Sequence, residues 1–311
     1  MNIILLGAAG FIGTNLTLAL AKDPQNCITL VDRDRAYFAS IEALSLSNVS
    51  IAVSDFAADG MFDALLTGQD VVYHLVSTTI PTNSNQQIPQ EITANVVFTA
   101  NLLESCVRCG VKQVVFLSSG GTVYGKETDC PLREETVTYP ISSYGLQKIT
   151  IEKLLHLYHH IHGLDYRIIR LANPYGPYQR PNGQLGAVTT FTYRALRDEP
   201  ICVYGDGSVV RDFIYIDDAI RGILNIVQGR GSYRTYNLGS GRGTSIRQVI
   251  DTIGRVLEKT PVVEYCPGRA VDVPVNYLDI SRYEQDFGPL APVCLAEGIA
   301  RTVEFMQAHY L

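Results

Sequence analysis

The chain has 311 residues and a formal net charge of −6, with 46% hydrophobic and 18% charged residues. This balance is that of a globular protein, and an acidic chain without a run of lysines or arginines excludes nucleic acid as an expected partner. No apolar stretch approaches the roughly 20 residues that cross a bilayer, and the first residues have the pattern of a strand rather than of a signal peptide. We therefore expect a cytoplasmic protein that does not bind membranes.

Short β-branched runs alternate with longer helical patterns in the first half of the chain. The runs that we expect to form strands are residues 3–6, 28–31, 49–53, 71–75, 114–118 and 167–171. Most of them are almost continuously apolar, as are strands covered on both faces of a parallel sheet. The pattern predicts an α/β fold, with a doubly wound parallel sheet of the Rossmann type over residues 1–172.

Gly7, Gly10 and Gly13 form a GxxGxxG turn after the first of these runs. One glycine permits the tight turn from strand to helix, one lets a pyrophosphate approach the backbone, and one lets the helix pack closely on the strand. The helix that begins near Phe11 and Ile12 offers unpaired N–H groups and a positive dipole end to the phosphates. The turn predicts a dinucleotide site, although a tight glycine turn without a ligand has the same sequence.

Asp32 ends the second run, about 20 residues after the glycine turn. A carboxylate at this place accepts hydrogen bonds from the adenosine ribose hydroxyls and repels a 2′-phosphate. This favours NAD over NADP. Arg33, the next residue, leaves the opposite preference open, because an arginine can accommodate that phosphate.

Tyr144 and Lys148 lie four residues apart, on one face of an expected helix. An ammonium group close to a phenol favours the phenolate, which can then take a proton at neutral pH. Either the pair or the glycine turn alone is a weak signal, because both occur by chance. Together, in this order, they predict a nicotinamide-dependent enzyme that acts on an alcohol or a ketone.

Two other groups of residues could suggest a metal or redox site. Cys106 and Cys109 form a CxxC in a helical pattern, but the chain has no second CxxC to complete a zinc site. His156 and His160 share a helix face without the acidic residue of an HExxH motif. We expect reduced thiols with a packing role, a solvated helix end and no metal.

The sequence changes character at residue 173. Residues 173–177 and 181–183 are rich in turn formers, and the elements that follow are short and mixed with loops and basic residues. We predict a smaller C-terminal α/β lobe over residues 173–311 that binds the substrate. A segment near 212–238 is expected to return to the first domain.

The GxxGxxG spacing combined with YxxxK resembles the short-chain dehydrogenase/reductase superfamily. Further motifs are similar to its extended, nucleotide-sugar branch and, within that branch, to UDP-glucose 4-epimerase-like enzymes. These motifs are residues 118–125, 170–177, 203–207, 211–218 and 236–241, followed by Arg269 and Asp272. The resemblance covers essentially the whole chain.

The resemblance implies an NAD-dependent 4-epimerase of a UDP-hexose. Tyr144 would remove the proton from the sugar O4, and Lys148 would hold the nicotinamide ribose and lower the pKa of the phenol. Gly121 and Thr122 stand where dehydratases carry an Asp-Glu pair, so elimination lacks its acid and base. The cofactor-binding residues that we predict are Gly7, Gly10, Phe11, Ile12, Gly13, Asp32, Asp55, Leu75, Asn95 and Lys148.

For the UDP-sugar, the resemblance implies a second set of residues. Arg211 and Arg269 would bind the diphosphate, since a guanidinium group contacts phosphate oxygens bidentately. The other substrate-binding residues that it implies are Asn173 at the phosphates, Val203 and Tyr204 at the uracil, and Asp272 at the ribose. Asn276, which is smaller than the tyrosine that crowds this position in relatives, would leave room for a larger group at the sugar C2.

The sequence departs from the family at Gly120, where a Ser or Thr hydroxyl normally bonds the reacting oxygen. Thr122 lies two residues on, on the same side of an extended segment, and is our leading replacement as a catalytic residue. Ser119 is the second candidate, and a water held in the space beside Gly120 is the third.

Two other functions share these motifs. A reductase of a 4-keto nucleotide sugar would use NAD(P)H and exchange it at each turnover. A non-catalytic NAD-sensing protein would use the same scaffold without needing Tyr144 or Lys148. The resemblance also implies a homodimer, formed through the early part of the Tyr144 helix and the segment 93–109. The sequence does not identify the sugar.

Overall fold

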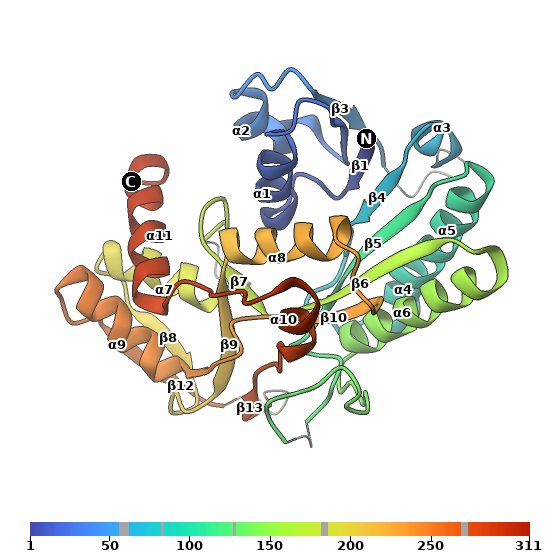
Figure 1. The fold of residues 1–311 in the computed structure, drawn as a ribbon. Helices are drawn as coiled ribbons and strands as arrows, with labels where there is room; N and C mark the ends of the chain where they lie inside the picture. The colour runs from blue at the N-terminus through green and yellow to red at the C-terminus, as the bar shows by residue number, and fades with distance from the viewer. Residues whose placement is uncertain (56–61, 82–83, 127–128, 182–185, 269–272) are drawn as a thin grey trace. The chain divides into compact units, whose positions relative to one another are not determined.

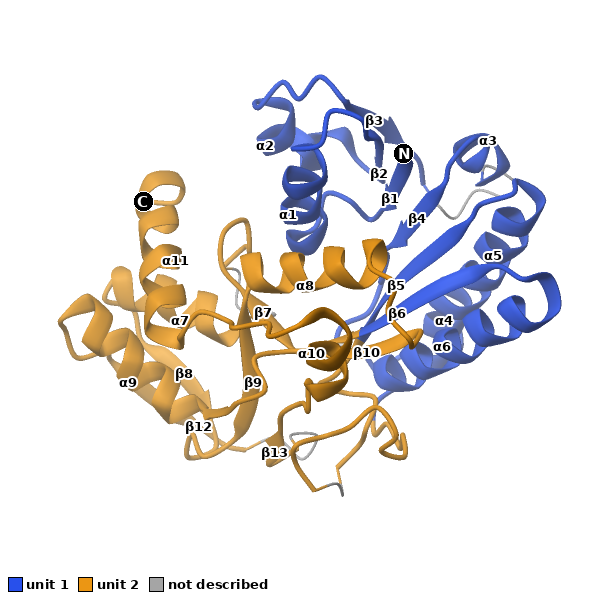
Figure 2. Ribbon diagram, viewed as in Figure 1, with its two compact units in different colours: residues 1–118, 142–169 blue, residues 119–141, 170–311 orange. Residues whose placement is uncertain are grey.

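The computed structural model describes residues 1–55, 62–81, 84–126, 129–181, 186–268 and 273–311 (Figure 1). These residues form two compact units, coloured separately in Figure 2. Unit 1 comprises Met1–Ser118 and Ser142–Ile169, and unit 2 comprises Ser119–Ile141 and Arg170–Leu311. In this division by compactness residues 119–141 and 212–238 group with unit 2, and the boundary at residue 172 with its return segment stays a prediction.

The parallel strands of unit 1 have the order expected of a dinucleotide-binding sheet. Among these strands the order is β6-β5-β4-β1-β2-β3, so the chain adds β2 and β3 on one side of β1 and then β4, β5 and β6 on the other. Ligands bind at such a switch point, beyond the carboxyl ends of the strands. The strands are β1 (Asn2–Leu6), β2 (Cys27–Asp32), β3 (Val49–Val53), β4 (Val71–His74), β5 (Gln113–Ser119) and β6 (Asp165–Leu171).

Helices cover both faces of these strands, as the doubly wound prediction requires. Figure 1 shows α1 on one face and α3, α5 and α6 on the other. α6 begins after Ser142, whose hydroxyl accepts the Gly145 N–H, and ends at Gly163, which has a positive φ of 71°. The helical segments are α1 (Phe11–Leu20), η1 (Arg35–Phe38), α2 (Ala39–Glu42), α3 (Phe62–Leu66), α4 (Ile88–Ile92), the π-helix η2 (Thr93–Val97), α5 (Phe98–Arg108) and α6 (Ser143–His162).

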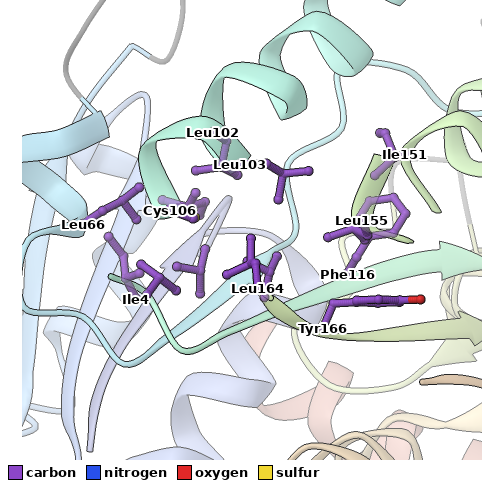
Figure 3. Packing of buried hydrophobic residues seen from close by; sticks show 14 of the residues in the cluster. Ile4, Leu66, Leu102, Leu103, Cys106, Phe116, Ile151, Leu155, Leu164 and Tyr166 are labelled. Carbon is purple, nitrogen blue, oxygen red and sulfur yellow. The ribbon is translucent and has the colours of Figure 1, made fainter. Parts of the chain in front are cut away.

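The core of unit 1 lies between the strands and α5 and α6. Leu102 and Cys106 of α5, Leu155 of α6 and Phe116 of β5 pack together there, as Figure 3 shows. Burial raises the pKa of the Cys106 thiol to about 12, which keeps it protonated at neutral pH. The CxxC prediction of a packing role therefore fits Cys106, whereas Cys109 is only half-buried.

Unit 2 is a mixed α/β lobe, as predicted. Strand β9 pairs with β11, β13 and β7, and β12 pairs with β8 in a separate ribbon, where Cys202 and Cys266 form a disulfide that the sequence did not suggest. Its elements are β7 (Asn173–Tyr175), α7 (Ala187–Leu196), β8 (Ile201–Tyr204), β9 (Val210–Tyr215), α8 (Ile216–Gln228), β10 (Thr235–Leu238), β11 (Gly243–Ser245), α9 (Ile246–Leu257), β12 (Val263–Cys266), β13 (Val275–Asn276), α10 (Ser281–Phe287) and α11 (Leu295–His309). None of the helices in the described part of the chain combines the length and hydrophobicity that a membrane crossing needs.

Candidate active site

Two of the three glycines of the turn have a geometric reason to be glycine. Gly7 has a φ of +82°, and a Cβ there would lie 3.0 Å from the backbone of Leu75 and Val76. A Cβ on Gly13 would lie 2.4 Å from the Ala8 carbonyl oxygen, so only glycine lets α1 pack this closely on the turn. Gly10 is exposed, and a Cβ on it would meet only the Gly7 oxygen, at 3.6 Å. Of the three, Gly10 is therefore the one whose backbone is open to a ligand.

Asp32 lies against this turn, as predicted from its position at the end of β2. Its Oδ2 accepts the Ala9 N–H at 3.1 Å, and its Oδ1 accepts the Arg33 N–H at 2.8 Å. The register pairs Leu6 with both Val31 and His74, so Gly7, Asp32 and Leu75 follow the carboxyl ends of neighbouring strands. Asp55 is exposed two residues beyond β3, at the same edge.

Asn95 connects the π-helix η2 to the loop after β4. Its Oδ1 accepts the Thr78 N–H at 2.9 Å, and its Nδ2 donates to the Thr78 hydroxyl at 2.9 Å. Single π-helical turns are often found at functional sites. The structure thus brings Asn95 to the same strand edge as the glycine turn and Leu75.

Lys148 is buried and faces Tyr144. Its Nζ donates to the Leu117 carbonyl at 2.9 Å and lies 5.5 Å from the centre of the Tyr144 ring. Burial lowers the pKa of Lys148 to about 8, and the nearby Glu152 charge partly opposes this shift. The side chain therefore stays largely protonated at neutral pH. His74 is neutral there, because burial and the Lys148 charge lower its pKa to about 3.

In unit 2, the segment after β5 carries the hydroxyl that we predicted to replace the family's serine. The Thr122 Oγ1 is buried and has no hydrogen-bond partner among the described residues. The space beside Gly120 is filled: a Cβ at this position would lie 2.6 Å from Leu278 Cδ1 and 3.1 Å from the Arg170 carbonyl oxygen. A side chain at residue 120 would therefore require Leu278 to shift, and the relay water, our third candidate, stays a prediction.

Asn276 has a contact that its size alone did not suggest. It is 2% exposed, and its Nδ2 donates to the Gly120 carbonyl at 3.3 Å. Within unit 2, this hydrogen bond links the Asn276 side chain to the backbone of the Gly120 segment.

The predicted substrate-binding residues have different surroundings in unit 2. The Arg211 Nη1 donates to the Val273 carbonyl at 2.5 Å, and the Asn173 Nδ2 donates to the Asp212 carbonyl at 2.8 Å. Val203 is 1% exposed and belongs to the core, whereas Tyr204 is 43% exposed. Arg269 and Asp272 lie outside the described residues.

Sequence reasoning missed Asp212, which organises this part of unit 2. Its carboxylate accepts N–H groups of Ser240, Gly241 and Leu278 and the Ser240 hydroxyl, while burial raises its pKa. The sequence feature that could have identified Asp212 was its position inside the 211–218 motif.

The model of the NAD dependent epimerase/dehydratase family matches residues 3–239. The chain belongs to this family. The match confirms the resemblance drawn from the motifs and the predicted fold class. Among its relatives, a UDP-glucose 4-epimerase of Mycolicibacterium smegmatis is 33% identical to this chain, and the alignment covers 99% of both proteins.

Solved structures support the same assignment. A UDP-glucose 4-epimerase from Thermotoga maritima with UDP-glucose aligns over 99% of both chains, with 31% identity and a TM-score of 0.91. A UDP-glucuronic acid 4-epimerase from Bacillus cereus, in complex with UDP-glucuronic acid and NAD, covers 100% of both chains with 28% identity and a TM-score of 0.89.

Proposed function

We propose that this protein is an NAD-dependent 4-epimerase of a UDP-hexose. The observation that carries the proposal is the buried Lys148 ammonium group beside the Tyr144 ring, in a chain of the NAD-dependent epimerase/dehydratase family. A binding protein without catalysis has no use for a phenol whose ionisation is favoured by a buried cation. This distinguishes the proposal from an NAD-sensing role.

The residues at the strand edge of unit 1 fit NAD. Gly10 leaves its backbone accessible, and α1 starts there without a side-chain cap or an acidic residue in its first turn. The free N–H groups and the helix dipole suit a pyrophosphate, and Asp32 suits the two ribose hydroxyls. When bound, NAD supplies the reversible oxidation at the sugar C4.

The chain's own residues then handle the proton and the substrate. Tyr144, as the phenolate, takes the O4 proton as the C4 alcohol becomes a ketone, and the Lys148 ammonium group favours this phenolate. The Thr122 hydroxyl donates a hydrogen bond to O4. Arg211 and Arg269 hold the diphosphate, so the 4-keto sugar turns about a fixed anchor before reduction on its opposite face.

One NMR assay tests this function. Purified protein is incubated with UDP-glucose, UDP-N-acetylglucosamine or UDP-glucuronate without added NAD(H), and Tyr144→Phe is the control. We expect the C4 epimer of at least one sugar with wild type and none with the variant. Turnover that needs stoichiometric NAD⁺ or NADP⁺ and yields a 4-keto sugar with NADH or NADPH would identify a 4-keto sugar reductase running in reverse and refute the epimerase proposal.

The remaining predicted site residues also belong to this proposal. We propose that Asp55, Leu75 and Asn95 complete the NAD site and that Asn173, Val203, Tyr204 and Asp272 complete the UDP-sugar site. Because Val203 is a core residue of β8, its contribution would come from its backbone. The homodimer and the cytoplasmic location remain predictions.

A further inference from the structure

A buried carboxylate lies at the start of the helix that carries Tyr144 and Lys148. Glu91 of α4 is 7% exposed, and its Oε2 accepts the Ser143 hydroxyl at 2.5 Å and the Gln147 Nε2 at 3.2 Å. Its Oε1 accepts the Gln87 N–H at 3.2 Å. Within the described part of the chain no cation pairs with it, so N–H and O–H donors alone hold the charge. The Ser143 hydrogen bond is the main reason why the pKa of Glu91 lies below its usual value, and the group is ionised at neutral pH.

Gln147 extends this arrangement to the π-helix η2. Its Nε2 also donates to the Ser143 hydroxyl oxygen at 2.8 Å, and its Oε1 accepts the Asn95 Nδ2 at 2.7 Å. The Asn95 Nδ2 also donates to the Glu91 carbonyl at 3.0 Å, which closes the network within unit 1. Both ends of the Gln147 amide are therefore fixed by partners that are themselves buried.

The network binds Ser143 and Gln147, which directly precede the two proposed catalytic residues in the sequence. Ser143 and Gln147 are four residues apart and share one face of α6, and Tyr144 and Lys148 form the adjacent stripe, about 100° further round the helix. Fixing the first pair fixes the rotation of this turn about the helix axis. A rotation of about 10° would move a tyrosine hydroxyl, roughly 9 Å from the axis, by roughly 1.5 Å. Misplacement by about 1 Å can reduce a rate about a hundredfold.

A general packing role does not explain this chemistry. Apolar side chains of similar size would fill the same space without the cost of burying a charge, so the ionised group is a poor choice for stability alone. What the carboxylate adds is direction, because each of its oxygens accepts bonds from specific donors. We propose that Glu91 is a positioning residue for the Tyr144–Lys148 pair and acts through Ser143 and Gln147. This inference rests on the proposed function of that pair.

The test compares Glu91→Gln with Glu104→Gln, which removes an exposed carboxylate from the neighbouring helix α5. Glu91→Gln keeps the size of the side chain but replaces one acceptor oxygen with a donor. We expect its kcat to fall at least tenfold, by about this factor at every pH, with unchanged KM and NAD binding, and we expect Glu104→Gln to match wild type. If kcat is retained and only the acid limb of the pH profile moves, Glu91 acts through its charge and the positioning role is refuted.

A second variant keeps the test decisive if Glu91→Gln does not fold. Gln147→Met retains the volume of the side chain and removes its hydrogen bonds to Glu91, Ser143 and Asn95, and it should lower kcat to a similar extent. If both single variants fold, the kcat of the double variant should be no lower than that of the less active single variant, because both substitutions break the same network. Fully additive losses would overturn the proposal.

Tyr144→Phe separates this inference from the proposed function. If Tyr144→Phe is inactive while Glu91→Gln has wild-type kcat, the positioning role fails and the function stands. If Tyr144→Phe is itself active, the proposed function fails, and with it any reason to position this residue.

Discussion

Replacing Thr122 with valine should make the protein more stable and less active. Valine keeps the shape of threonine and removes only the hydroxyl, and the Thr122 Oγ1 is buried without a hydrogen-bond partner among the described residues. An unsatisfied buried hydroxyl costs about 1–3 kcal/mol of folding free energy. A side chain kept at such a cost is expected to have its partner in the substrate.

The two effects can be estimated separately. Removing the unsatisfied hydroxyl should raise the free energy of unfolding by about 1 kcal/mol, which corresponds to a Tm increase of roughly 2 °C for a protein of this size. A single donor to the reacting oxygen contributes about 2–4 kcal/mol to the transition state, so kcat should fall by about thirtyfold or more. KM should hardly change, because the lost bond strengthens mainly in the transition state.

Calorimetric unfolding and steady-state epimerisation of Thr122→Val measure both quantities. Ser119→Ala is the matched comparison, because it removes the other candidate hydroxyl from the same segment. Normal kcat in Thr122→Val, whatever its stability, would refute the assignment of Thr122. A loss of activity in Ser119→Ala instead would move the role to that residue.

Tyr144→Phe should keep the fold and NAD but lose turnover by several orders of magnitude, and more than about a tenth of wild-type activity would contradict the mechanism. Asp32 should make NAD bind more tightly than NADP in calorimetry; equal or tighter NADP binding would show that Arg33 controls the ribose. Arg211→Ala should raise KM and weaken UDP inhibition by roughly 2–3 kcal/mol, and unchanged UDP inhibition would remove this residue from the site. Gly120→Ser should unfold at a lower temperature and should not rescue Thr122→Val, because its Cβ would lie 2.6 Å from Leu278 Cδ1. Rescue without loss of stability would show that the packing adapts.

The fold of unit 1 could be predicted because its signals are local. Each of the strands β1 to β6 follows a mainly apolar run, and each appears within a few residues of its expected place. The glycine turn and Asp32 could be placed together for a similar reason, since the carboxyl ends of parallel strands share one edge. The pair Tyr144 and Lys148 needed only the helical period.

The positioning network could not be predicted in this way. Glu91 and Gln147 are 56 residues apart, and no spacing in the sequence relates a buried glutamate of a short helix to the first turn of α6. Glutamate residues are usually exposed, so the residue type alone argues against a buried position for Glu91. Only the packing of α4 and η2 against α6 shows that the first turn of this helix is held by specific donors and acceptors.

Gly120 shows how the packing around a residue adds to what its identity in the sequence suggests. The missing side chain suggested a space for a water. In the structure Leu278 fills that space, and Asn276 bonds the Gly120 carbonyl. A serine at residue 120 would therefore require Leu278 to shift. A Gly120→Ser enzyme would need a smaller residue at 278 as well, and the activity of a Gly120→Ser/Leu278→Val double variant would measure that coupling.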